Sequence, residues 1–279
     1  AGALGNGGTT AFAGAGAVAF NTLRGGAEAG LKRTRVTSGT LRVAATDISK
    51  VRADAGGVSL GIGIGVSRGS GTGLALGAAI AFNKSQDRVI RASLDNATVD
   101  TGDLVVEATS SSTIDALTLA GAGALGKGGE GGGGYAASGA GAYSRNQITD
   151  TIEARITGSD VRSTGQLRVT ARDDATIDSE TYGAAISLAG SNSGNGGALS
   201  IGFSMSNNTI TSNVLADIVN SVVDAGAAGI TLSSTNAATI TATAVAASVS
   251  AAASGTGKGV GLSGGGAAAL NDVQGSTLA

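Results

Sequence analysis

The residues best suited to chemistry are carboxylates, which fall into two groups. The denser group is Asp173, Asp174 and Asp178, and the second is Asp95, Asp100 and Asp103. Carboxylates could supply the acid and base of glycoside cleavage or the oxygen ligands of Ca²⁺. Neither group recurs along the chain, so we interpret both as exposed polar corners. Weak calcium binding and a carbohydrate-active or carbohydrate-binding surface are the alternatives.

The amino-acid composition excludes most other kinds of catalytic or metal-binding site. The 279 residues include no His, Cys, Pro or Trp. Ser-His-Asp and Cys-His mechanisms are therefore excluded, and the commonest zinc ligands are missing. The glycine-rich stretches contain no phosphate-binding GxxxxGK[ST] motif. We therefore expect no enzymatic activity, no catalytic, cofactor-binding or metal-binding residues, no cofactor and no nucleic-acid partner.

Hydrophobic positions and asparagines recur along the chain every 62 or 63 residues. Self-similarity at a fixed period is typical of repeat architectures. Repeats are expected near residues 21–82, 83–145, 146–207 and 208–270, with partial repeats at both ends. The aligned positions are Leu41, Leu104, Leu167 and Ile230; Val51, Ile114, Ile177 and Ile240; and Asn21, Asn83, Asn146, Asn208 and Asn271.

Each repeat carries short strand patterns. Ile152, Ala154 and Ile156 alternate with the charged Glu153 and Arg155, which predicts a strand with one buried and one outward face. A second alternating run, such as Leu167–Val169, is followed by a polar bend, for example at 173–174. Short turns are expected before this run at the glycines Gly39, Gly102 and Gly165.

Other segments alternate glycine or serine with an apolar residue. They are 58–67, 73–83, 183–190 and 196–207. A face made of glycine has no side chains to hold a neighbour away, so two sheets could approach closely there, or the chain could bend. The polar, glycine-rich connectors at 68–73, 126–134 and 191–197 are expected to form loops at the edge of the repeat.

These patterns predict an all-β fold, a repetitive β-solenoid (β-helix-like) of about four and a half repeats that forms one domain over residues 1–279. Equivalent strands would stack about 4.8 Å apart. Stacking would place the aligned asparagines in a hydrogen-bonded ladder. One wide coil per repeat, or two or three smaller coils, would each satisfy the pattern.

The text IEARITGSDVRSTGQLRVTARDDATI (152–177) and its copies, with the glycine-alternating strands between them, resembles the repeats of giant bacterial surface and filamentous-adhesin proteins with β-solenoid stalks. The resemblance implies an extracellular or cell-surface protein that acts in adhesion, matrix or filament formation. It suggests self-association or continuation of the same repeat, with a host surface or polysaccharide as a further partner. We expect the chain to be a piece of a longer protein.

Charge is unevenly distributed. Residues 21–82 carry a net charge of +5, whereas residues 83–145, 146–207 and 208–279 carry −2, −3 and −2. A basic end followed by acidic repeats would favour head-to-tail association. The sequence contains no stretch of 18 strongly apolar residues, so we expect no membrane-spanning segment. The threonines Thr239, Thr241 and Thr243 suggest an ice- or surface-binding array as a further alternative.

Overall fold

The computed structural model describes all of residues 1–279 and contains strands but no helix, so no helix could cross a lipid bilayer. Three sheets of parallel strands make up the molecule. Sheet A contains β1 (Gly2–Gly5), β5 (Lys50–Gly65), β8 (Thr113–Lys127), β12 (Thr176–Ser191) and β16 (Thr239–Ser254). Sheet B contains β2 (Thr9–Leu23), β3 (Ala27–Lys32), β6 (Gly71–Asp95), β9 (Gly134–Thr157), β13 (Gly196–Val219) and β17 (Gly259–Leu278). Sheet C contains β4 (Arg35–Asp47), β7 (Thr98–Ser110), β10 (Asp160–Ser163), β11 (Leu167–Asp173), β14 (Val222–Ala225) and β15 (Ile230–Asn236).

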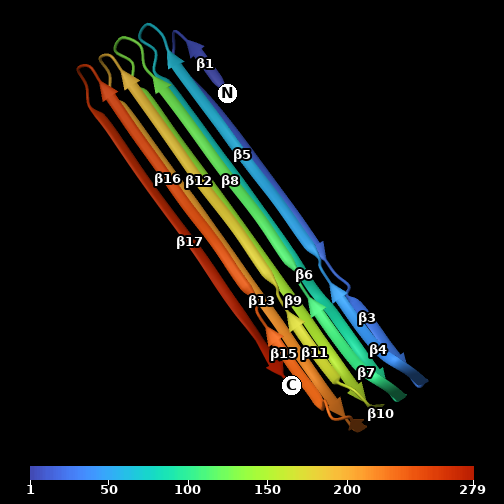
Figure 1. Ribbon diagram of the computed structural model, residues 1–279. Helices are drawn as coiled ribbons and strands as arrows, with labels where there is room; N and C mark the ends of the chain where they lie inside the picture. Colours follow the sequence, from blue (N-terminus) through green and yellow to red (C-terminus); the bar gives the residue numbers. More distant parts are fainter.

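The chain visits the sheets in a fixed order. It runs along β6 in sheet B, returns through β7 in sheet C and β8 in sheet A, and then enters β9 beside β6. One such passage, which we call a coil, takes 62 or 63 residues, so each sequence repeat makes one wide coil. Sheet B packs against both sheet A and sheet C. The result is a flat stack of long strands with its loops gathered at one end (Figure 1).

Equivalent residues pair in register, as the sequence predicts. Leu104 lies between Leu41 and Leu167 in sheet C, and Ile114 lies between Val51 and Ile177 in sheet A. Every one of these pairings is parallel, which is consistent with a β-solenoid-like fold. Like residues therefore form columns that run from coil to coil.

The interior differs between the two halves of each coil. Between sheet C and the adjoining part of sheet B, 19 buried residues form a core of large aliphatic side chains such as Leu104 and Ile152. We call this region the aliphatic half. Toward the loops, the buried cluster between sheets A and B consists of 14 alanines. We call this region, residues 1–20, 56–83, 119–144, 182–206 and 245–270, the glycine-rich half.

Sheets A and B approach closely in the glycine-rich half. A Cβ atom added to Gly77 would overlap the carbonyl group of Gly121 in the facing sheet, and one added to Gly183 would overlap that of Phe203. The Ser187 hydroxyl donates directly to the Leu199 carbonyl across this gap at 2.6 Å. Because a serine side chain spans the interior, the sheets lie closer than the usual spacing of about 10 Å. The expected close approach is confirmed.

The prediction of turns at Gly39 and Gly102 is wrong. Both glycines lie inside strands β4 and β7, and only Gly165 falls between strands. The reason is continuous pairing, since Ser38 pairs with Thr101 and Thr40 with Asp103 on either side of these glycines. The glycine-rich connectors do form the loops at the end of the stack, at 66–70, 128–133 and 192–195.

The close approach predicts how single methyl groups affect stability. Gly77→Ala should lower the free energy of unfolding by about 1–3 kcal/mol, because the new Cβ meets backbone that cannot rotate away. Gly141→Ala is the matched control, since nothing lies within 4 Å of a Cβ at that strand position. Chemical denaturation of both variants measures the difference. Equal stabilities would contradict the close approach of the two sheets.

Candidate functional site

An asparagine ladder runs through the stack. The Asn21, Asn83, Asn146 and Asn208 side chains each donate from Nδ2 to Oδ1 of the next asparagine, at 2.9, 2.7, 2.7 and 2.9 Å, and Asn271 is the last acceptor. The three inner members are buried. Each amide therefore satisfies one donor and one acceptor of its neighbours. The ladder predicted from the sequence is confirmed.

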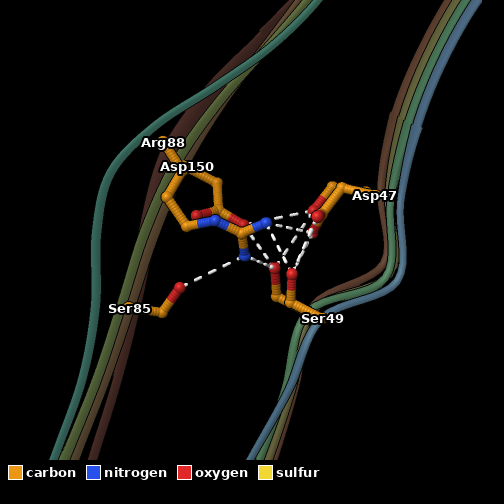
Figure 2. A network of polar contacts seen from close by, with 7 residues as sticks. Asp47, Ser49, Ser85, Arg88 and Asp150 are labelled. Carbon is orange, nitrogen blue, oxygen red and sulfur yellow. Dashed lines mark hydrogen bonds and ion pairs between the residues drawn. The ribbon is translucent and has the colours of Figure 1, made fainter. Parts of the chain in front are cut away.

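A buried ionic cluster lies between sheet B and the bend that joins sheets C and A (Figure 2). Its centre is Arg88, which is only 3% exposed. A β-bulge between Ser85 and Arg88 shifts the register of β6 and turns the arginine inward. The Arg88 guanidinium pairs with Asp47 and donates to Ser49 at 2.8 Å and to Ser112 at 2.7 Å. The Arg88 Nε atom has no hydrogen-bond partner, so the buried guanidinium is satisfied through Nη1 and Nη2 only.

The next coil places two carboxylates in the same corner without a second cation. Asp150 Oδ2 accepts hydrogen bonds from Ser112 at 2.8 Å and Ser110 at 3.1 Å, but its Oδ1 has no partner. Asp173 is 0% exposed, and neither of its carboxylate oxygens has a hydrogen-bond partner. This corner therefore holds three acidic residues, Asp47, Asp150 and Asp173, against one arginine.

The interpretation of Asp173 as an exposed polar corner is wrong. Asp173 continues the inward alternation of Leu167, Val169 and Ala171, and it pairs with Ser110 at the end of strands β11 and β7. The chain bends only after this residue, so its side chain stays inside.

Burial also changes the acidity of this corner. Desolvation raises the pKa of Asp173 to about 6; the nearby Ser212 and Ser110 hydroxyls oppose the rise, and the Asp150 and Asp174 carboxylates add to it. Burial likewise raises the pKa of Asp150, although its hydrogen bond from Ser112 and the charge of Arg88 oppose the rise. Both carboxyl groups therefore hold protons more tightly in the folded state than in the unfolded chain.

The remaining acidic residues do not join Asp173 in one site. Asp174 points outward and binds Arg172 with two hydrogen bonds of 2.6 Å, while Asp178 is exposed on sheet A beside Asp115. Asp173 therefore faces the interior at the end of sheet C, whereas Asp174 and Asp178 face outward beyond it. An acid and a base for glycoside cleavage would have to flank one bond, which this arrangement does not allow.

The second acidic group makes local contacts. Asp95 accepts from the Ser93 hydroxyl at 2.9 Å, Asp103 accepts from the Gln166 backbone N–H at 2.9 Å, and Asp100 is exposed. No group of three or more acidic residues converges to hold a metal ion.

The outer surface of the aliphatic half is charged, and its ion pairs join neighbouring coils. Three arginines contact carboxylates one coil away: Arg42 with Glu107, Arg91 with Glu153, and Arg155 with Asp217, at 2.7, 2.7 and 2.8 Å. The threonines Thr241 and Thr243 lie beside Asp178 and Glu180 of the adjoining strand, so they do not extend into a regular threonine array.

Both ends of the stack leave strands with a neighbour on one side only. At one end these are β1, β2, β3, β4 and the part of β5 before Ile62, and at the other they are β14 to β17. The asparagine ladder is open in the same way: Asn21 Oδ1 lacks a donor, and Asn271 Nδ2 lacks an acceptor. Each end thus presents the complement of the other.

Comparison of the chain with protein-family models, curated proteins and solved structures found no match. The functional inference therefore depends on the geometry of this molecule alone.

Sequence reasoning did not identify Asp47, Arg88 and Asp150 as a cluster. One signal was present, since the repeat spacing changes from 63 to 62 residues between Ser85 and Arg88, where the bulge lies. The parity of the alternating pattern changes at this point, which turns a charged side chain inward.

The buried ladder predicts a position-dependent cost of losing an amide. Asn146→Ala should destabilise the fold by about 3 kcal/mol, because it leaves the Asn83 donor and the Asn208 acceptor buried and unpaired. Asn213→Ala, at an exposed position of the same sheet, should cost less than about 0.5 kcal/mol. Denaturant titrations of both variants measure the difference. Equal losses would show that the ladder contributes no special stability.

The buried carboxyls predict that stability falls as pH rises. The pKa of Asp173 is about 6 in the folded state and near the ordinary 3.8 in the unfolded chain. The protonated carboxyl therefore contributes its full stability below about pH 4, and this contribution is lost as the pH rises through 6. The full shift corresponds to about 3 kcal/mol. Asp173→Asn should raise the unfolding free energy at pH 7.5 and flatten its pH dependence between pH 4 and 7.5.

Asp178→Asn is the control, because this carboxylate is exposed on the outer face. It should leave the pH profile unchanged. If Asp173→Asn and Asp178→Asn give the same profile as the unmodified chain, the elevated pKa of Asp173 is contradicted.

Proposed function

We propose that the chain is a repetitive β-solenoid of about four and a half 62–63-residue repeats that forms the structural body of an extracellular fibre or adhesin stalk. The observation that carries the proposal is the unbroken stacking of like residues, of which the asparagine ladder is the clearest case. A column of this kind continues with every added copy of the repeat.

Backbone hydrogen bonding supports a mechanical role. Of 191 backbone hydrogen bonds, 162 lie within the strands, and the strands pair between coils. Such bonds run along the stack, so a pull along the stack is shared across the whole width of each coil. Proline is absent from the chain, which suits uninterrupted pairing.

The two ends support growth by self-association. Exposed strand edges recruit further strands, and the open donor of Asn271 matches the open acceptor of Asn21. Either a continuation of the same repeat or a second copy would fit. The excess of basic residues in 21–82 and of acidic residues in the later repeats favours the same head-to-tail order.

The proposal places the protein at the cell surface or outside the cell, in a role that is not enzymatic. A carbohydrate-active surface gains no support, because Asp173 lies inside the fold while Asp174 and Asp178 lie outside.

Electron microscopy of the purified chain tests the proposal. The unmodified protein should form fibres that lengthen with concentration. Asn271→Asp should shorten them several-fold, because it removes the Nδ2 donor and sets a carboxylate against the Asn21 carbonyl of the next copy, while it still accepts from Asn208. Asn192→Asp, in an exposed loop, is the control and should leave fibre length unchanged. Particles that remain single at every concentration would refute self-association by stacking.

A further inference from the structure

The outer face of sheet B over the glycine-rich half is apolar. Phe12, Leu76 and Ile201 are 60%, 55% and 54% exposed, although they are large hydrophobic residues. In the glycine-rich half, all charged side chains lie at or beside the loops: Arg68, Lys127, Glu130 and Lys258. Small residues fill the interior, and the large apolar ones point outward, which reverses the usual arrangement.

This face is large for an unoccupied surface. It spans five strands, β2, β6, β9, β13 and β17, each with 11 to 13 residues in the glycine-rich half. Strand spacing and rise give it an area of roughly 1,000 Å². Monomeric soluble proteins rarely expose contiguous apolar patches beyond a few hundred Å². A stable interface buries about 800 Å² on each partner, so the face is sufficient for one.

The face has a ridge-and-groove relief. Leu76 on β6 and Ile201 on β13 form two ridges, and Ala137 and Gly139 on β9 form the floor between them. The hollow has a volume of about 290 Å³. The ridges are two strands apart, about 10 Å, which is the width of one row of large side chains.

We propose that this face packs on the same face of a second copy, side by side, around a two-fold axis parallel to the strands. Such an axis keeps the glycine-rich halves together and reverses the order of the coils. The ridge on β6 of each copy then enters the groove over β9 of the other. Because charged residues border the apolar area only at the loops and in the aliphatic half, both copies bury apolar surface against apolar surface.

This association differs from end-to-end stacking, because it uses side chains on a face rather than backbone groups at an edge. It does not depend on the proposed fibre function. In a micrograph, stacking sets the length of a particle and side-by-side packing sets its width.

Light scattering of the full chain at low concentration, with electron microscopy of the same samples, tests the proposal. The unmodified protein should show paired width and at least twice the monomer mass. Leu76→Glu should halve both, because it places a charge on the ridge that enters the groove. Val105→Glu, an outward residue of sheet C in the aliphatic half, is the matched control and should keep the paired width. Thermal unfolding of each variant checks that it folds.

Three outcomes would overturn the proposal. These are single width in the unmodified protein, paired width that survives Leu76→Glu, and single width accompanied by binding to neutral phosphatidylcholine vesicles, which would assign the face to lipid. Loss of length without loss of width would refute only the stacking function.

Discussion

Parallel, in-register pairing of one coil with the next is the constraint on which the rest of the structure depends. It places every residue over its equivalent, so a single buried amide becomes the ladder from Asn21 to Asn271, and a single leucine becomes the column through Leu104. A residue that matches its column gains the same contacts as its equivalents, whereas a residue that differs from them must find partners of its own. The buried carboxylate of Asp173 has neither a hydrogen-bond partner nor an ion pair, and it is costly in a column where the neighbouring coils offer only Ser110 and Asn236.

The two halves of a coil solve the packing problem in different ways. The aliphatic half buries leucine, isoleucine and valine and carries ion pairs outside, as globular proteins do. The glycine-rich half buries alanine, serine and glycine and relies on hydrogen bonds such as that from Ser187 to the Leu199 carbonyl between its closely spaced sheets. Its large side chains have no place inside, and they therefore cover both outer faces, with Phe203 on sheet B and Ile186 on sheet A.

Much of this fold could be predicted from the sequence, because the period and the alternation of residues report backbone geometry directly. The columns through Leu104 and Ile114, the asparagine ladder and the close approach at the glycines all follow from spacing. The direction of a side chain is harder to predict where the parity of the pattern changes. Arg88 points inward only because a bulge precedes it, and Asp173 stays inside because the strand ends one residue later than the polar text suggests. The number of coils per repeat could not be predicted for a different reason. Alternation determines which residues face each side of a strand, but it does not show where the chain reverses direction.

The unequal interiors give each coil a tapered profile, thin at the loops beside Arg68 and Glu130 and thicker at the aliphatic end. Flat bodies that pack face to face remain parallel, whereas tapered bodies in face-to-face contact are inclined to one another. A pair joined through sheet B would therefore be a wider wedge, thin along the loop edge and thick along the aliphatic edge. The glycines that thin one side of the coil would in this way also set the cross-section of the pair.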